Sequence, residues 1–358
     1  VSERYRKSTM GALRFAFLST FALDFFSSLS VAIVALFLGL GLINEQMVLL
    51  PALTVLILAP EYFLPIRDFG TDYHATLDGK NALKAITHII DLPEQQRNES
   101  IEIAQWNEDS TLNVQNLSLQ YNESNEYSLK DISFSWKGFG KIGIIGASGA
   151  GKSTLINVLG GFAHPTSASI QINNETITSF NTKEWQQQVL YIPQHPYIFN
   201  DTLANNVSFY TPNATNEEIQ QACHHAGLST VIESLPNGLD ERIGESGRAL
   251  SGGQEQRIAF ARAFLDQSRK ILLFDEPTAH LDIETEWELK QNILPLLDGR
   301  LVFFATHRLH WMLEMDYIIV MDQGKIVETG THEQLLKAKG TYTQLIQAQM
   351  HGTEEQYG

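Results

Sequence analysis

The sequence is poor in cysteine and in basic residues. Its 358 residues include one cysteine, Cys223, and 25 Lys and Arg against 41 Asp and Glu, for a formal net charge of −16. A single cysteine excludes a disulfide framework and suits a reducing compartment. The acidic balance argues against a nucleic-acid surface, because binding to phosphates needs clustered Lys and Arg. We therefore expect no nucleic-acid partner.

Cys223 is followed by His224 and His225, a run that could be taken for part of a metal site. One thiolate and two adjacent imidazoles do not easily complete a tetrahedron around zinc. We therefore expect a helix face here.

Charge is also scarce between residues 15 and 66, where the charged side chains are Asp24, Glu45 and Glu61. Residues 15–43 exceed the roughly 20 residues that cross a bilayer core, and they are too long for the apolar region of a secretory signal. A turn at Asn44–Gln46 then leads to a second predicted span at residues 47–66. The two spans predict a helical hairpin in a lipid bilayer.

Basic residues lie on both sides of this hairpin and not in its turn: Arg4, Arg6, Lys7, Arg14, Arg67, Lys80 and Lys84. Since basic residues favour the cytosolic side, both ends of the hairpin are predicted to be cytosolic. Apolar positions at helical spacing predict that the second helix extends into the cytosol to about residue 92. The polar stretch 93–100 then predicts a boundary between domains at 1–97 and 98–358.

The segment "KIGIIGASGAGKSTLINVL" contains the phosphate-loop pattern G-x-x-x-x-G-K-[ST] at Gly146–Ser153. In such a loop, glycines let backbone N–H groups curl around phosphates, the lysine contacts the β and γ phosphates, and the serine hydroxyl binds magnesium. An apolar run precedes the loop and a helical pattern follows it, which strengthens the match. The candidate ATP-binding residues here are Gly146, Ser148, Gly149, Gly151, Lys152, Ser153 and Thr154.

The segment "KILLFDEPTAHLD" supplies acidic groups for the same site. Ile271–Phe274 predicts a buried parallel strand that ends at Asp275 and Glu276. Asp275 would hold Mg²⁺ directly or through water, and Glu276 would polarise the attacking water. The alternative is a pair of exposed acids at a strand end.

The segment "ALSGGQEQRIAFARAFL" resembles the signature of ATP-binding-cassette (ABC) proteins. A hydroxyl and two glycine amides stand at the start of a predicted long helix, which is an arrangement that binds anions. The matching residues are Ser251, Gly252, Gly253 and Gln254. The resemblance implies that this signature completes the ATP site of a partner subunit, so that two cassettes must meet.

The resemblance assigns three further positions to the ATP site. Tyr121 matches the aromatic residue that stacks on adenine, with an ordinary strand tyrosine as the alternative. Gln194 matches the glutamine that touches Mg²⁺ and the attacking water. His307 matches the switch histidine that contacts the γ phosphate, although a strand-end histidine is the ordinary alternative.

Three other positions concern coupling between subunits and domains. Glu245 falls where exporters carry a loop that senses the membrane helices. Asp282 matches the aspartate of the D-loop, which is expected to lie in the ATP-binding interface. His280 stands where the family more often has a small residue, and we expect it to tune coupling.

The order of membrane hairpin, cytosolic helix and cassette resembles one half of an ABC exporter. The expected fold class is therefore a membrane α-helical segment, the last two transmembrane helices of an exporter, followed by an α/β P-loop ABC ATPase domain with a helical subdomain. Exporter halves of this family carry six spans, and the chain begins at Val1. We expect it to be the C-terminal portion of a longer polypeptide.

Two membrane motifs point to a subfamily: "LDFFSSLSVAIVALFLG" and "LILAPEYFLPIRDFGTDYHA". They resemble the D subunit of the bacterial heterodimeric cysteine/glutathione exporters that are required for cytochrome bd assembly. The resemblance implies a multi-pass protein of the bacterial inner membrane with its cassette in the cytosol. It also implies a non-identical partner and export of a small thiol.

Several polar residues of these motifs are candidate substrate contacts. Asp24 and Glu61 lie in or at the membrane and are expected to face the interior of the bundle. Tyr73 and His74 raise a second hypothesis, because a neutral imidazole can ligate haem iron. The alternative for His74 is a solvated or packed histidine, and for Arg67–Asp68 it is a surface ion pair.

The leading function is thus ATP-driven export of cysteine or glutathione, with ATP and Mg²⁺ as cofactors. Haem transport, or haem-responsive regulation by the same architecture, is second, with haem as substrate or cofactor. A lipid or drug exporter is third. A soluble ABC ATPase acting on ribosomes or DNA is disfavoured by the two spans and by the acidic charge.

Overall fold

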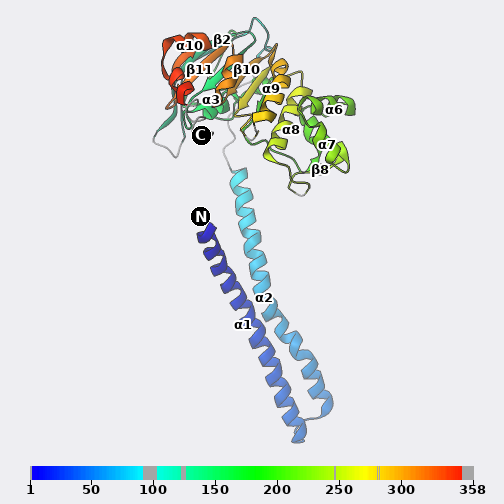
Figure 1. Cartoon of the computed structure of the whole chain (residues 1–358). Coiled ribbons are helices and arrows are strands. Elements are labelled where there is room, and N and C mark those ends of the chain that lie inside the picture. The colour runs from blue at the N-terminus through cyan, green and yellow to red at the C-terminus, as the bar shows by residue number, and fades with distance from the viewer. Residues whose placement is uncertain are drawn as a thin grey trace, which may run out of the picture. The chain divides into compact units, whose positions relative to one another are not determined.

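The computed structural model of the chain describes residues 2–91, 103–121, 126–245, 247–279, 281 and 283–348. The chain divides into two compact units, Val1–Gln95 and Gln96–Gly358. The first unit is helical and the second contains the sheets, as Figure 1 shows.

The first unit is an antiparallel pair of helices, α1 (Ser2–Ile43) and α2 (Leu49–Ile90) (Figure 1). The connecting turn includes the predicted residues Asn44–Gln46. Its Glu45 has a positive φ of 56°, and the backbone N–H of Gln46 donates to the carbonyl of Gly41 at 2.9 Å. The helices therefore form the expected hairpin.

The two helices differ in how far their apolar segments extend. Within the described residues, Asp24–Ile43 is long and apolar enough to cross a membrane, whereas the corresponding part of α2 is the shorter segment Leu49–Tyr62. The predicted second span, residues 47–66, contains this shorter apolar segment, which Glu61 and the polar residues after it limit to fewer than the roughly 20 residues that span a bilayer core. The full extent of the second span stays a prediction.

Helix α2 continues through Pro60 and Pro65 and ends at Ile90, where the N–H of Asp91 donates to the carbonyl of Thr87 at 2.8 Å. Each proline removes one backbone donor from the helix interior. The predicted extension to about residue 92 thus agrees with the end of α2 to within two residues. The polar linker 93–100 lies outside the described residues.

The second unit is built on a six-stranded sheet in the order β12-β11-β3-β10-β9-β6. Its inner strands pair in parallel, and β12 is an antiparallel edge. The strands are β3 (Gly140–Ile145), β6 (Val189–Ile192), β9 (Ile271–Asp275), β10 (Leu301–Ala305), β11 (Tyr317–Asp322) and β12 (Lys325–Gly330).

Both faces of this sheet are covered, which explains the unbroken apolar runs of its central strands. Alternate residues of β9 and β10 enter two different cores. Leu272 and Phe274 pack with the helical part of the unit, whereas Ile271 and Leu273 pack toward the phosphate-loop helix and the second sheet. The predicted buried strand Ile271–Phe274 is thus present, and it delivers Asp275 and Glu276 at its carboxyl end.

A second, antiparallel sheet of four strands, in the order β2-β1-β4-β5, packs on one face of the six-stranded sheet. Its strands are β1 (Thr111–Gln120), β2 (Tyr127–Lys137), β4 (Ser167–Ile172) and β5 (Glu175–Ile177). A two-stranded ladder pairs β7 (Asp201–Thr202) with β8 (Arg242–Ile243).

The helices of this unit are α3 (Lys152–Leu159), α4 (Lys183–Gln186), α5 (Leu203–Val207), α6 (Asn216–His225), α7 (Ser229–Ser234), α8 (Gly252–Leu265), α9 (Ile283–Leu297) and α10 (His332–Ala338), with 3₁₀ turns η1 (Ser208–Tyr210), η2 (Gly238–Asp240) and η3 (Leu309–Glu314). Helices α6, α7 and α8 lie together at one side of the unit, and α10 lies at the other side, near β11 (Figure 1).

The Cys223–His225 run ends helix α6, as the helix-face interpretation expects. Cys223 is buried in the core, and this burial raises the pKa of its thiol to about 12, whereas His224 and His225 are exposed. The thiol is therefore protonated at neutral pH and acts as an apolar core side chain.

Candidate nucleotide-binding site

The loop between β3 and α3 requires glycine at both of its ends. A Cβ on Gly146 would meet the carbonyl oxygen of Met321 at 2.2 Å, and Gly151 has a φ of +99°. Gly151 is also the N-cap of α3, with no side-chain cap. The first amides of α3 are therefore left without a side-chain acceptor, in the arrangement that binds phosphate at a helix N-terminus.

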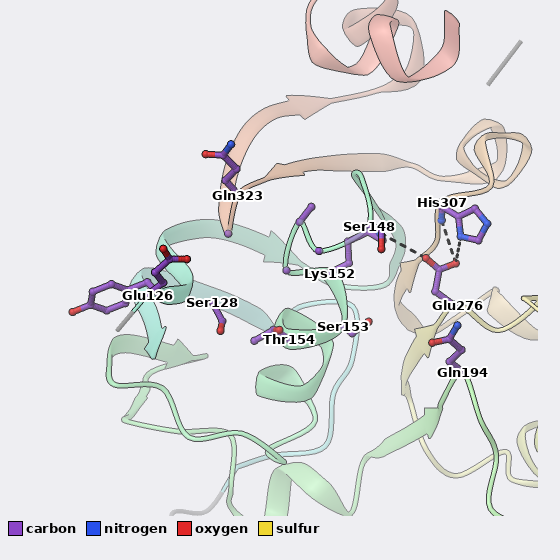
Figure 2. A pocket seen from close by; sticks show the side chains of 15 residues that line it. Glu126, Ser128, Ser148, Lys152, Ser153, Thr154, Gln194, Glu276, His307 and Gln323 are labelled. Carbon is purple, nitrogen blue, oxygen red and sulfur yellow. Dashed lines mark hydrogen bonds and ion pairs between the residues drawn. The ribbon is translucent and has the colours of Figure 1, made fainter. Parts of the chain in front are cut away.

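Lys152 is 7% exposed and folds back over this loop. Its Nζ donates to the carbonyls of Gly146 at 2.9 Å and Ala147 at 3.2 Å, and lies 3.7 Å from Oε1 of Glu276 (Figure 2). The ammonium group is thus held beside the loop and next to a carboxylate. A phosphate in the loop would meet a positive charge that is already in place.

Ser153, at the end of the loop, is hydrogen-bonded to Asp275, at the end of β9. The hydroxyl of Ser153 donates to Oδ1 of Asp275 at 2.7 Å, and Asp275 is 6% exposed. Burial raises the pKa of Asp275; the Ser153 bond lowers it, the charge of Glu276 raises it and the charge of Lys152 lowers it, with a net rise. Two oxygen ligands of the kind that Mg²⁺ prefers therefore lie within hydrogen-bonding distance of each other.

Glu276 and His307 form a second pair, at the ends of β9 and β10. Oε2 of Glu276 lies 2.7 Å from Nδ1 of His307 and also accepts from the His307 backbone N–H at 3.2 Å and the Thr306 hydroxyl at 3.3 Å (Figure 2). An ionised carboxylate only accepts, so the imidazole carries its proton on Nδ1 and leaves Nε2 as an acceptor when neutral.

Glu276 has a φ of +48°, in the left-handed region. Such a conformation costs roughly 1–3 kcal/mol for a residue other than glycine, and it persists where the surroundings hold it. Here the N–H of Glu276 donates to the carbonyl of Ala305 at 2.8 Å. The strained turn directs a 9% exposed carboxylate into the pocket.

These groups line a pocket of about 1030 Å³. The predicted residues on its lining are Ser148, Gly149, Gly151, Lys152, Ser153, Thr154, Gln194, Glu276 and His307. Gly146 and Asp275 support the lining from behind, through the loop turn and the Ser153 bond respectively.

Six lining residues had not been predicted: Glu126, Tyr127, Ser128, Ala150, Gln323 and Gly324. The outer ones come from the start of β2 and from the β11–β12 turn. The Gly324 N–H donates to the Ala150 carbonyl at 3.1 Å, which brings that turn against the phosphate loop. Gln323 and Gly324 both have a positive φ, as a two-residue hairpin turn requires, and a glycine at such a position indicates a turn in the sequence. No signal in the sequence indicated that this turn lies against the phosphate loop.

Tyr121 is not among the residues on this lining. It follows the end of β1 and is 47% exposed, and residues 122–125 lie outside the described residues. Its stacking on adenine stays a prediction. Tyr127 is the tyrosine that the structure places on the lining.

The predicted signature lies elsewhere, at the start of α8. Ser251 is its N-cap and forms a capping box with Gln254: the Ser251 hydroxyl accepts from the Gln254 N–H at 3.3 Å, and Gln254 Oε1 accepts from the Ser251 N–H at 3.0 Å. Ser251 and Gly252 are exposed, and no signature residue lies on the phosphate-loop pocket. The signature is thus presented on the surface of this chain, apart from the phosphate-loop pocket.

Comparison with known proteins agrees with these features. Residues 129–279 match the family described as "ABC transporter". Over 98% of its length, the chain is 56% identical to the glutathione/L-cysteine transport system ATP-binding/permease protein CydC of Bacillus subtilis. The chain belongs to the CydC/CydD family of ABC transporters.

Two further relatives extend the comparison. The protein named CydD in Escherichia coli is 33% identical over 96% of this chain. A solved structure of a bacterial Atm1-family ABC exporter with ATP bound is 27% identical, covers 97% of this chain and 61% of its own, and gives a TM-score of 0.67. The chain spans 60% of the length of the CydC and CydD proteins it matches.

The expected fold class is confirmed: a helical N-terminal segment precedes an α/β ABC ATPase domain. The resemblance to the cysteine/glutathione exporters is also confirmed as a family assignment. The D subunit is not singled out, because the identity is higher to a protein named CydC than to one named CydD. The identities over the whole chain thus place it in the CydC/CydD family and not specifically with the D subunit.

Among the other predicted positions of the ATPase domain, Glu245 is not on the pocket lining. Glu245 is exposed and lines a groove of about 300 Å³ that includes Tyr197 and Leu250. His280 and Asp282 lie outside the described residues, so their roles stay predictions.

In the helical unit, Asp24 is half-buried on α1, whereas Glu61 and Tyr73 are exposed on α2. Tyr73 stacks with Phe69 at a ring distance of 6.4 Å. The side chains of Arg67 and His74 lie outside the described residues, so the Arg67–Asp68 ion pair and a haem-ligating His74 remain untested.

Proposed function

We propose that this chain is part of one half of an ATP-driven exporter that moves cysteine or glutathione out of the bacterial cytosol. The observation that carries the proposal is the 56% identity, over 98% of the chain, to a glutathione/L-cysteine transport protein. The hairpin would lie in the inner membrane and the cassette in the cytosol. A second, non-identical half would complete the exporter.

Within the proposal, the phosphate loop binds ATP. The loop amides and Lys152 neutralise the β and γ phosphates, and Thr154 lies on the same lining. Ser153, Gln194 and Asp275 would hold a magnesium ion; the contact between Ser153 and Asp275, at 2.7 Å, supports a pair of hard oxygen ligands. The ion would neutralise charge on the phosphates.

Glu276 is the proposed general base. Its carboxylate is held by His307 and Thr306, so that it is oriented before the attacking water arrives. It would accept the proton of that water as the oxygen attacks the γ phosphorus. A phosphate oxygen only accepts, so His307, whose side chain is 55% exposed, would reach the γ phosphate with an N–H on Nε2 while its Nδ1–H stays on Glu276, which requires the imidazole to carry both protons.

Hydrolysis also requires the partner. The exposed residues Ser251 and Gly252 at the start of α8 would contact the nucleotide of the opposite half, and the opposite signature would complete this site. Binding of ATP would thereby close the two cassettes, and hydrolysis would let them separate.

The test is uptake into inside-out vesicles that contain the protein and its partner half. Labelled cysteine and glutathione should accumulate when ATP is present, and Glu276→Gln should abolish accumulation with ATP binding retained. Hydrolysis without accumulation of either thiol would overturn the export proposal. Labelled haem is the third arm, and its accumulation in place of thiols would identify a different substrate.

A further inference from the structure

A further buried carboxylate lies close to the loops that carry Glu276 and His307. Glu286, on α9, is 2% exposed, although no motif of the phosphate site includes it. It is followed by Trp287 and Glu288, both of which are exposed, so of Glu286 and Glu288 it is Glu286 that α9 turns inward.

Both oxygens of Glu286 are occupied by donors from two loops. Oε1 accepts from the hydroxyl of Thr278 at 2.6 Å and from Nε1 of Trp311 at 2.8 Å, and it lies 3.4 Å from Nε2 of His310. Oε2 pairs with the Arg308 guanidinium.

These donors are close in sequence to the reacting groups. Thr278 is two residues beyond Glu276, and Arg308 directly follows His307. Arg308 also donates from Nη2 to the carbonyl of Leu281 at 3.1 Å. Glu286 therefore joins the loop that carries Glu276 to the loop that carries His307, and it is not itself on the pocket lining.

The carboxylate is ionised at neutral pH. Burial by itself raises the pKa of Glu286, but the bonds from His310, Thr278 and Trp311 and the charge of Arg308 lower it to about 2. Removing one partner of a buried, fully bonded charge costs more than removing a surface ion pair. The two loops are thus joined by a rigid contact.

We propose that Glu286 is a positioning residue for ATP hydrolysis, which sets the placement of Glu276 relative to His307 without touching the nucleotide. This inference rests on the hydrolysis that is part of the proposed function. A base must be held within a few tenths of an ångström of its productive position. Loosening the contact should therefore slow the chemical step and leave ATP binding unchanged.

The experiment measures kcat and KM for ATP hydrolysis by the protein assembled with its partner half. Glu286→Gln replaces one acceptor oxygen with an NH₂ donor, which faces donors it cannot bond. We expect kcat to fall about 10- to 100-fold with KM changed less than about twofold, the pattern of a lost transition-state interaction. Glu288→Gln removes the same charge from the exposed side of α9 and should leave both constants unchanged.

A second pair of variants keeps the test independent of folding. Thr278→Val removes the hydroxyl that reaches Glu286, whereas Thr278→Ser keeps it. Serine should retain near wild-type kcat, and valine should lower it about 5- to 20-fold, since it loses one of the hydrogen bonds that hold Glu286 in place.

Two results would overturn the inference alone: a wild-type kcat in Glu286→Gln where Glu276→Gln is inactive, or equal kcat values for the valine and serine variants. If Glu286→Gln does not fold, the Thr278 pair decides. A wild-type assembly that binds ATP without hydrolysing it would instead overturn the proposed function, and this inference with it.

Discussion

Helices α3 and α8 of the ATPase domain begin in different ways, the first after a glycine and the second after a serine. Helix α3 starts after Gly151, whose φ of +99° is left-handed and which offers no side-chain cap. Helix α8 starts after Ser251, in extended conformation, and Ser251 and Gln254 cap each other's backbone amides.

The difference shows how one kind of sequence can serve two kinds of site. The uncapped start of α3 lies beside Lys152 and Glu276 and leaves its amides for a ligand of the same chain. The capped start of α8 is satisfied on its own and stays exposed. We interpret the first as a site that binds ATP directly and the second as a preformed surface that meets a nucleotide carried by the partner.

Replacing Lys152 should have the largest effect. Lys152→Ala removes the charge held over the phosphate loop, and we expect hydrolysis to fall at least ~100-fold, the size typical of lost electrostatic stabilisation. Phosphate release measures hydrolysis, and titration with a fluorescent ATP analogue measures ATP binding. Lys183→Ala changes an exposed lysine and should change neither. Hydrolysis within threefold of wild type would contradict the role given to the phosphate loop.

Replacing Ser251 should separate binding from hydrolysis. Ser251→Ala should cost about 1 kcal/mol of unfolding free energy through the lost cap. It should also lower hydrolysis by the assembled protein about tenfold, while this chain's affinity for ATP is unchanged. Thr331→Ala is the matched control, because Thr331 and Gln334 form the same capping box at α10. If both variants lose stability and hydrolysis equally, the signature acts only through the stability of its helix.

Replacing Gln256 should have the smallest effect. Gln256 is fully buried on α8, and its Nε2 donates to the carbonyl of Gln194 at 2.7 Å, so it links the helix of the signature to a residue on the phosphate-loop pocket. We expect Gln256→Leu to lower kcat about two- to fivefold at unchanged KM, since about one hydrogen bond is lost. Gln220→Leu, at an exposed position of α6, is the control. A raised KM at constant kcat would show that the link serves ATP binding.

The sequence was informative where the chemistry depends on neighbouring residues. Gly146, Gly151, Lys152 and Ser153 share one loop, so their spacing alone predicted a phosphate site. It was less informative about α2: the apolar segment Leu49–Tyr62 is shorter than the roughly 20 residues that cross a bilayer core, so the extent of a second span stays a prediction. The left-handed φ of Glu276 had no sequence signal either, since it depends on the hydrogen bond to Ala305.

Contacts between distant segments had no local signal. Ser128 and Gln323 reach the pocket through strand pairing and a hairpin turn, and Glu286 meets Arg308 across 22 positions of the chain. Each of these residues, taken alone, reads as an ordinary polar residue of a strand, turn or helix.

The two units, the hydrophobic hairpin and the residue types of the ATP site follow from the sequence alone, because they depend on composition, glycine conformation and short spacings. Which of these groups act together depends on tertiary packing. Strand β9 pairs with β10 so that Asp275 stands opposite Ala305, and this register is what brings Glu276 to His307 and Thr278 to the loop of Arg308. Such a register is set by packing on both faces of the sheet, which no single segment of the chain contains.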